Sequence, residues 1–373
     1  MRIGIDAHVL GKGLGGVERF LRHVVEELPR VAPQHEYVIF MNRQAVRDGL
    51  LQAAANVKIV PLAVSNPLIE RSLLLPWLIR RHRLDALMVQ RLAPWFCGRC
   101  KLVLTVHDIT PLKFPREYRG LTNRLVQLLT GDSVRRADLI FTPTQTIADE
   151  VRSYFGVKDT PIRPFYNGVD VQSFSRAPGE MQPAQLIEKQ GICRPYIFVS
   201  GAIEARKNLE TIYRAVGALA PDHPVDLVLA GSIRDQAYAD RLANLAQTLG
   251  IESRVRRLGF VEEDLLVALY QQALAYTTAS RDEGFNIPPL EAMACGIPVI
   301  CSDIPVHREL FEGSALFFPV DSAEALANCI RQVITAPESL KHLRENGNAL
   351  VARLNWRATG ERVAAGFARL IEK

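Results

Sequence analysis

At 373 residues, the chain is long enough for two domains that each bury a substantial core. Its 23% of charged and 48% of hydrophobic residues are ordinary for a soluble globular enzyme, and its net charge of +5 suits an anionic ligand or surface without requiring nucleic acid. No apolar run is long enough to span a membrane, and the apolar stretch at the start is too short for a signal peptide, so we expect a cytoplasmic protein.

The first predicted unit consists of a strand over residues 2–9, a glycine-rich turn over 11–16 and a helix over 17–28. Such a unit can bring backbone close to phosphate groups. A dinucleotide fingerprint would need an acid at the end of the second strand, but Glu36 begins that strand, and Lys12 precedes the glycines that a Walker lysine should follow. A glycine-rich loop alone is a weak signal, so a plain tight turn remains an alternative.

The segment over residues 66–84 combines an apolar face that includes Trp77 with a basic run at its end. It can be a helix that covers the sheet, with terminal cations that complement the helix dipole, or a helix that rests on an anionic membrane surface. Because Pro76 weakens a long interfacial helix, we favour the sheet-covering helix and keep the membrane contact open.

The six cysteines include one pair with metal or redox spacing, Cys97 and Cys100. A structural zinc site would need a second pair, which the sequence lacks. We therefore expect no metal site and interpret the cysteines as small apolar residues.

A strand over residues 101–106 ends at His107. Ligands of open α/β sheets lie beyond the carboxyl ends of the strands, so His107 is well placed to contact one. A histidine at a strand end also often has a structural role, which is the alternative here.

The second half opens with a strand over residues 196–200 that runs into Gly201, and Arg206 and Lys207 follow at the start of a helix. Two adjacent cations at such a place can neutralise a diphosphate that a helix N-terminus alone would only partly satisfy. The alternative is a solvated basic pair.

Residues 281–298 predict a loop, a short helix that Pro288 and Pro289 open, and a strand. Glu283 precedes the helix and Glu291 lies in its first turns, so both carboxylates are expected near a helix N-terminus that favours an anion. Two carboxylates beside an anion site suit a ligand with hydroxyl groups and phosphate, such as a nucleotide sugar. The alternative is a dipole-complementing Glu291 and a solvated Glu283.

The string EGFNIPPLEAMACGIPV, which begins at Glu283, resembles the Glu-x7-Glu motif of the retaining glycosyltransferases of family 4. The sequence Gly-x4-Arg-Lys-Asn-Leu from Gly201, the Gly-Gly turn at Gly15 and the His-Asp-x-x-Pro sequence at His107 also match that family. The matches extend from Gly15 to Glu291, over most of the chain.

The resemblance implies the α/β fold called GT-B, with two Rossmann-like, doubly wound parallel-sheet domains and an interdomain cleft. Alternating strands and helices in both halves agree with this fold class. Because residues 161–192 are rich in proline, glycine and glutamine, we place the domain boundary there. We expect an acceptor-side domain over residues 1–180, a nucleotide-sugar domain over 181–354, and a last helix over 355–373 that crosses back to the first domain.

The resemblance also implies roles for individual residues. Glu283 would bind the donor-sugar hydroxyls, Glu291 the ribose, and Arg206 with Lys207 the leaving diphosphate. His107 would face the sugar across the cleft and position it. The remaining donor-binding positions that follow from the family pattern are Gly15, Gly16, Gly259, Phe260, Val261, Gly284, Phe285, Asn286 and Ile287.

The function that follows is transfer of a hexose from a nucleotide diphosphate sugar to a saccharide or lipid-linked saccharide acceptor, in polysaccharide biosynthesis. Where the family commonly has glycine, this chain has Asn286, which tolerates unusual backbone angles and can alter the choice of sugar. A UDP-hexose is favoured slightly over GDP-mannose.

The reaction is expected to need no cofactor and no essential metal, because no Asp-x-Asp motif stands where a diphosphate would bind. In the family the leaving phosphate is thought to accept the proton of the acceptor, so no protein nucleophile is assigned. A nucleotide-sugar epimerase of the same fold and a catalytically silent sugar-binding subunit are the alternatives. Nucleic acid is not an expected partner, and peripheral contact with the inner face of the membrane stays open.

Overall fold

The computed structural model describes residues 1–13, 15–51, 54–62, 73–114, 121–175, 182–192, 195–219 and 222–371. The chain divides into two compact units, one formed by Met1–Gly168 with Trp356–Lys373 and the other by Val169–Asn355. This division comes earlier in the chain than the expected boundary at 180, which lies outside the described residues.

The first unit contains a seven-stranded sheet in the order β3-β2-β1-β4-β5-β6-β7, and its neighbouring strands pair in parallel. One of its interior strands, β1, carries Ile3 and Ile5, which are fully buried, as expected for a parallel sheet covered on both faces. The strands are β1 (Arg2–Ala7), β2 (Glu36–Asn42), β3 (Val57–Leu62), β4 (Ala86–Gln90), β5 (Lys101–Thr105), β6 (Leu139–Thr142) and β7 (Ile162–Pro164).

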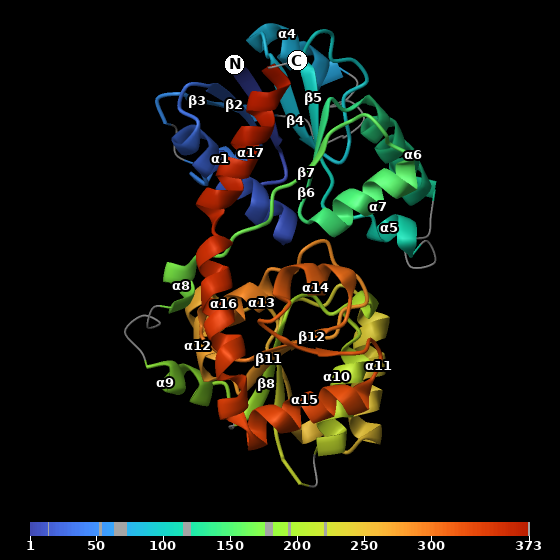
Figure 1. Ribbon diagram of the computed structural model, residues 1–373, viewed down its shortest axis with the longest axis vertical. Helices are drawn as coiled ribbons and strands as arrows, with labels where there is room; N and C mark the ends of the chain where they lie inside the picture. Colours follow the sequence, from blue (N-terminus) through green and yellow to red (C-terminus); the bar gives the residue numbers. More distant parts are fainter. Residues whose placement is uncertain are drawn as a thin grey trace. The chain divides into compact units, whose positions relative to one another are not determined.

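The last helix of the chain, α17 (Trp356–Ile371), belongs to the first unit and lies beside α1 (Gly16–Val31) (Figure 1). The two helices approach so closely that a Cβ atom on Gly360 would lie 2.8 Å from Cβ of Glu27. A glycine at this position therefore permits the contact. The other helices of this unit are α2 (Arg43–Arg47), α4 (Leu75–His82), α5 (Thr110–Lys113), α6 (Leu121–Arg136) and α7 (Gln145–Phe155).

The second unit contains a six-stranded parallel sheet in the order β10-β9-β8-β11-β12-β13. Its strands are β8 (Tyr196–Ser200), β9 (Asp226–Ala230), β10 (Val255–Arg257), β11 (Ala275–Thr278), β12 (Val299–Ser302) and β13 (Leu316–Phe318). Its helices are α8 (Val171–Ser175), α9 (Pro183–Glu188), α10 (Leu209–Leu219), α11 (Gln236–Thr248), α12 (Glu263–Gln272), α13 (Pro288–Ala294), α14 (Pro305–Phe311), α15 (Ala323–Thr335) and α16 (Lys341–Arg353), with short 3₁₀ turns at Ala205–Lys207, Glu252–Arg254 and Pro337–Leu340.

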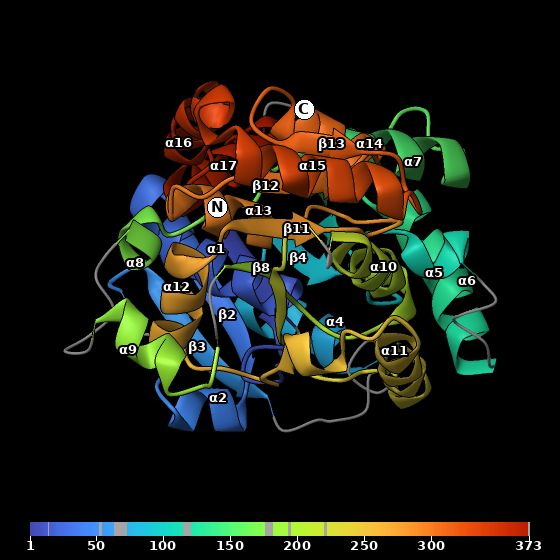
Figure 2. The same ribbon diagram turned by 90° about the horizontal axis from the view of Figure 1, so that it is seen from below.

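Helices α10 and α15 lie side by side in the second unit, where Ile212 and Ile330 are fully buried in one hydrophobic core (Figures 1 and 2). Helix α13 contacts β11 and β12. The predicted class of two doubly wound, parallel-sheet α/β domains is confirmed.

The strand order reverses between β1 and β4 in the first unit and between β8 and β11 in the second. Such a reversal leaves a crevice at the carboxyl ends of the two strands, where ligands of open α/β sheets bind. Within the described ranges, no group of three or more His, Cys, Asp or Glu residues could hold a metal ion, and no helix is long and apolar enough to cross a membrane.

Candidate active site

In the second unit, the loops that follow β8 and β11 bring the predicted cations and the predicted sugar-binding acid together. Lys207 and Glu283 are 76 positions apart in the chain, yet the Lys207 Nζ donates a hydrogen bond of 2.6 Å to the Glu283 Oε1. The reason is topological, since β8 and β11 are parallel neighbours and their carboxyl ends meet at one edge of the sheet.

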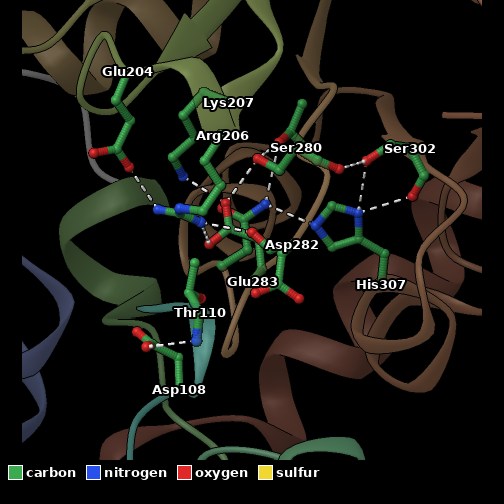
Figure 3. A network of polar contacts seen from close by, with 12 residues as sticks. Asp108, Thr110, Glu204, Arg206, Lys207, Ser280, Asp282, Glu283, Ser302 and His307 are labelled. Atoms are coloured by element: carbon green, nitrogen blue, oxygen red, sulfur yellow. Dashed lines mark hydrogen bonds and ion pairs between the residues drawn. The ribbon is translucent and has the colours of Figure 1, made fainter. Parts of the chain in front are cut away.

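The Arg206 guanidinium lies between two carboxylates (Figure 3). Its Nη1 is 2.8 Å from the Glu283 Oε2, and its Nη2 is 2.7 Å from the Glu204 Oε1. Nη1 also donates to the backbone oxygen of Asp282 at 2.6 Å. The Arg206 and Lys207 side chains are each only 17% exposed, so the alternative of a solvated basic pair is wrong.

Glu283 is a buried carboxylate whose charge is stabilised by its partners. Burial by itself would raise its pKa, but the charges of Arg206 and Lys207 and hydrogen bonds from Lys207 and Ser280 outweigh it, so the pKa lies well below its usual range. The Ser280 hydroxyl donates to the Glu283 Oε1 at 2.7 Å. Glu283 is therefore an ionised hydrogen-bond acceptor, and the alternative of a solvated loop acid is wrong.

Glu291 is 2% exposed on α13, and its Oε2 accepts a hydrogen bond of 2.7 Å from the Tyr270 hydroxyl. The Tyr270 oxygen is in turn 2.7 Å from the hydroxyl of Ser200, at the end of β8. Burial, with the nearby Glu291 charge, raises the pKa of Tyr270 well above its usual value. The phenol therefore stays protonated and donates a hydrogen bond to Glu291. A chain of hydroxyl groups thus orients Glu291.

The N-terminus of α13 offers few free helix N–H groups to the predicted anion. This helix has only seven residues, and its first two, Pro288 and Pro289, have no backbone N–H. The next two N–H groups, of Leu290 and Glu291, both donate to the backbone oxygen of Ile287. The side chains of Arg206 and Lys207 are therefore stronger candidates for contact with an anion than the first N–H groups of this helix.

Asn286 adopts a left-handed backbone conformation, with φ of 73°, as its tolerance for unusual angles predicted. Its Nδ2 donates to the Thr278 Oγ1 at 3.2 Å and to the Nε2 of His307 at 2.9 Å. The His307 Nδ1 donates to the backbone oxygen of Ser302 at 2.9 Å, which fixes the proton on Nδ1 and leaves Nε2 as an acceptor. The Thr278 hydroxyl and the His307 imidazole thus fix the orientation of the Asn286 amide, and the Ser302 backbone oxygen orients the imidazole (Figure 3).

The other residues of that loop divide between core and surface. Phe285 and Ile287 are 4% and 6% exposed, so their side chains belong to the core. Their predicted role in donor binding can therefore only involve the backbone. Gly284, which directly follows Glu283, is half-buried.

We expect His307 to make the protein sensitive to mild acid. Burial lowers the pKa of this fully buried histidine to about 4, from 6.5. Between pH 6.5 and 4 the unfolded chain binds a proton that the folded chain does not bind, so the free energy of unfolding falls as pH falls. The loss should reach about 3 kcal/mol. Urea unfolding at pH 7.5 and 4.5 should show a smaller loss for His307→Gln than for the native chain, and equal losses would contradict this account.

Three neighbouring strands of the second sheet end in glycine turns, at Gly201, Gly231 and Gly259. The Gly231 N–H donates to the Gly259 oxygen at 2.7 Å, and a Cβ atom on Gly231 would lie 1.9 Å from the Gly201 oxygen. A crevice at the end of β8 is lined by residues that include Gly201, Lys207 and Thr278. Phe260 is 81% exposed, and Val261 is half-buried beside it.

The remaining predicted site residues belong to the first unit. Gly15 has φ of 62° and forms the N-cap of α1, which Gly16 begins. The His107 Nε2 is 2.9 Å from the Gln90 Oε1. The imidazole ring packs edge-on against the Phe20 ring of α1, with ring centroids 5.1 Å apart. Burial, with the charge of Arg91, lowers the pKa of His107 to about 3, so the imidazole is neutral at physiological pH.

Sequence reasoning missed four residues that hold the site in place: Glu204, Tyr270, Ser280 and His307. Glu204 and Ser280 lie only two and three positions before Arg206 and Glu283, so proximity to a strand end could have identified them. Tyr270 and His307 come from α12 and α14, and only the packing of these helices reveals their contacts.

Two family models match the chain. Residues 14–173 match "Glycosyltransferase Family 4", and residues 185–350 match "Glycosyl transferases group 1". Together these matches span most of both units.

The relatives found by sequence include several mannosyltransferases. The chain is 27% identical over 284 residues to the serotype-specific mannosyltransferase WbdA of Escherichia coli, a match that covers 75% of this chain and 34% of WbdA. It is 28% identical over 253 residues to the O-antigen chain mannosyltransferase RfbU of Salmonella typhimurium, which covers 68% of this chain and 65% of RfbU. The chain thus spans about a third of the first relative and just under two thirds of the second.

The similar solved structures share the fold at low sequence identity. Sucrose-phosphate synthase from Thermosynechococcus elongatus has a TM-score of 0.79 at 20% identity, and the match covers 100% of this chain and 99% of that one. The Anabaena protein HepE, solved in complex with UDP and glucose, has a TM-score of 0.77 at 20% identity, with 99% and 100% covered. Both are similar in fold over their full length.

Proposed function

We propose that this chain, which is built from the two domains of the GT-B glycosyltransferases, is a retaining, metal-independent hexosyltransferase that takes its sugar from a nucleotide diphosphate donor. The observation that carries the proposal is the buried cluster in which Arg206 and Lys207 both contact Glu283. At the carboxyl edge of one sheet, this cluster places two cations that can bind a diphosphate next to an ionised carboxylate that can accept hydrogen bonds from sugar hydroxyls.

In the proposed reaction the bond between C1 of the sugar and the diphosphate oxygen breaks. A bond between C1 and the acceptor oxygen forms on the same face, and the proton of the acceptor hydroxyl passes to the leaving phosphate. Arg206 and Lys207 stabilise the negative charge that develops on the diphosphate. Glu283 contacts both cations, and Glu204 also contacts Arg206. Because these contacts already fix the two side chains, they need little reorganisation when the charge on the diphosphate develops.

The remaining groups of the site bind the donor. Glu291, held by Tyr270, binds the ribose hydroxyls, and the turn at Gly259, Phe260 and Val261 lines the base through backbone groups. Gly15 and Gly16 allow backbone to approach the phosphates, and neutral His107 positions the sugar. A residue with a lowered pKa near 3 is unsuited to act as a general base at neutral pH, which supports a positioning role.

The names of the relatives bear on the donor sugar and on the acceptor class. The names of WbdA and RfbU favour a mannosyl donor such as GDP-mannose over the UDP-hexose, and the O-antigen name of RfbU supports a polysaccharide or lipid-linked saccharide as the acceptor. Asn286 lies next to Glu283 through its loop and is the residue that we expect to influence sugar choice.

The test is nucleotide release from a panel of UDP- and GDP-sugars, with and without EDTA. Slow release from one donor, unchanged by EDTA and lowered at least about a hundred-fold in Lys207→Ala, would support the proposal. The matched control is Lys341→Ala, whose side chain is 68% exposed on α16 and should leave release unchanged. NMR of the glycoside formed with an acceptor should show the anomeric configuration of the donor.

Other results would contradict the proposal. Conversion of the donor to a different sugar without nucleotide release would indicate an epimerase. Donor binding by calorimetry without release in the presence of acceptors would indicate a silent sugar-binding subunit. Loss of activity with EDTA that Mg²⁺ restores would contradict metal independence.

A further inference from the structure

Helix α4 buries one face and exposes another that contains both apolar and basic side chains. Leu75, Leu78 and Ile79 are buried, and the His82 ring packs edge-on against Phe40 of β2, so this face of the helix packs toward the sheet. Residues 66–72 of the predicted segment lie outside the described residues. Trp77, however, is 53% exposed, and Leu73 before it is 69% exposed.

The exposed positions follow a helical period. Leu73, Trp77, Arg80 and Arg81 are spaced as the members of one helix face, and both arginines are exposed. The Arg81 guanidinium lies over the Trp77 ring at 5.2 Å from its centroid. This face therefore presents an apolar ring with a cation stacked on it.

A second element extends this surface. The loop between β4 and β5 exposes Trp95 and Phe96, at 58% and 56%, and the Arg80 guanidinium of α4 lies 5.5 Å from the centroid of the Phe96 ring. A hydrogen bond fixes the backbone of this loop, because the Arg136 Nη2 donates to the backbone oxygen of Trp95 at 2.9 Å. We call the surface formed by Leu73, Trp77, Arg80, Arg81, Trp95 and Phe96 the aromatic–arginine patch.

The two segments that carry the patch are basic, although Arg91 pairs with Asp108 and Lys101 with Asp138. Residues 73–84 and 91–101 contain no Asp or Glu, and they contain six arginines and lysines: Arg80, Arg81, Arg83, Arg91, Arg99 and Lys101. Tryptophan and arginine are side chains that anchor proteins at the interface between lipid headgroups and acyl chains.

We propose that the aromatic–arginine patch binds the surface of a bilayer that contains anionic lipids, with Trp77, Trp95 and Phe96 at headgroup depth and the arginines on lipid phosphates. A bilayer fits better than a protein partner because exposed aromatic rings lie beside exposed arginines, with Trp77 stacked on Arg81 and Phe96 near Arg80, which suits the boundary between acyl chains and phosphate headgroups. No described helix can span a membrane, so attachment through this surface would be interfacial. The proposal rests on the patch alone and is independent of the transfer reaction.

Intrinsic fluorescence provides a direct test because the chain has three tryptophans. Two of them are in the patch, whereas Trp356 is 7% exposed and stacks on His23, with ring centroids 4.2 Å apart. Added phosphatidylglycerol vesicles should shift the emission to shorter wavelength and protect the two exposed tryptophans from acrylamide. The shift should disappear in Trp77→Ala/Trp95→Ala.

Vesicle sedimentation tests the arginines. Each basic residue near an anionic surface strengthens binding about five-fold, so Arg80→Gln/Arg81→Gln should weaken partitioning about 25-fold at low salt. The matched control is Arg43→Gln/Arg47→Gln, two exposed arginines on α2 of the same unit, which should change partitioning by less than about three-fold.

Several outcomes would overturn the proposal. These are absence of partitioning to anionic vesicles, equal weakening by the α2 control, or binding without a change in tryptophan emission. Sedimentation velocity that showed a dimer dependent on Trp77 would instead assign the patch to a second copy of the chain. The vesicle measurements use no donor, so a chain that binds vesicles but releases no nucleotide would keep this proposal and refute the proposed function.

Discussion

Glu283→Gln is expected to lower kcat/KM for sugar transfer by about a thousand-fold, at the upper end of the loss for one preorganised electrostatic contact. The carboxylate contacts Arg206, Lys207 and Ser280, and glutamine would turn an amide group toward one of the two cations. The cations would lose their shared counter-charge and their orientation toward the diphosphate. Steady-state kinetics with the donor identified by nucleotide release would measure the effect.

The matched control is Glu204→Gln. Glu204 also pairs with Arg206, at 2.7 Å, but its other carboxylate oxygen faces Arg234 at 4.0 Å, and Figure 3 shows it on the other side of the guanidinium from Glu283. We expect its variant to lose less than about ten-fold. Similar losses in both variants would mean that Arg206 alone carries the effect, and native activity in Glu283→Gln would refute the assigned role of Glu283.

The same variant of Glu283 should also be less stable. Removing one partner of a buried ion pair leaves an uncompensated charge, which costs about 3 kcal/mol. Because glutamine keeps the shape and part of the hydrogen bonding, the chain should still fold, and circular dichroism would show whether the loss of activity occurs in a folded protein.

Gly231→Ala is expected to destabilise the second unit by about 4 kcal/mol and to abolish nucleotide binding. The Cβ of an alanine would lie 1.9 Å from the Gly201 backbone oxygen, and Gly231 has φ of 152°. A backbone atom cannot move aside as a flexible side chain can, so the turns after β8 and β9 would have to separate. Urea unfolding and calorimetric binding of UDP and GDP would measure the two effects.

Gly259→Ala is the control for backbone strain. Gly259 also has positive φ, of 70°, but no atom of the described residues beyond its chain neighbours lies within 4 Å of the place that an alanine Cβ would take. Its variant should therefore lose only the strain of a left-handed alanine, about 1 kcal/mol. Equal losses in the two variants would show that strain, and not the close approach of Gly201 and Gly231, sets the cost.

The sequence by itself determined the fold class and the segments that carry the site. Apolar runs of strand length alternate with helical periods, and glycines and prolines separate them, because these local patterns depend on residues a few positions apart. The rule that ligands lie beyond the carboxyl ends of parallel strands then selected His107. Adjacent cations at the start of a helix selected Arg206 and Lys207, and the Glu-x7-Glu motif selected Glu283.

Only the tertiary structure decided which of these groups meet and what they can do. The ion pair of Lys207 with Glu283 depends on β8 and β11 being neighbours, and the contacts of Glu291 and Asn286 depend on Tyr270 and His307 from other helices. Burial and charge pairing are properties of the packed chain, because a side chain loses water only when distant segments cover it. For the same reason the sequence could not show that Trp77 faces solvent, or that the N–H groups of Leu290 and Glu291 are already bonded to Ile287.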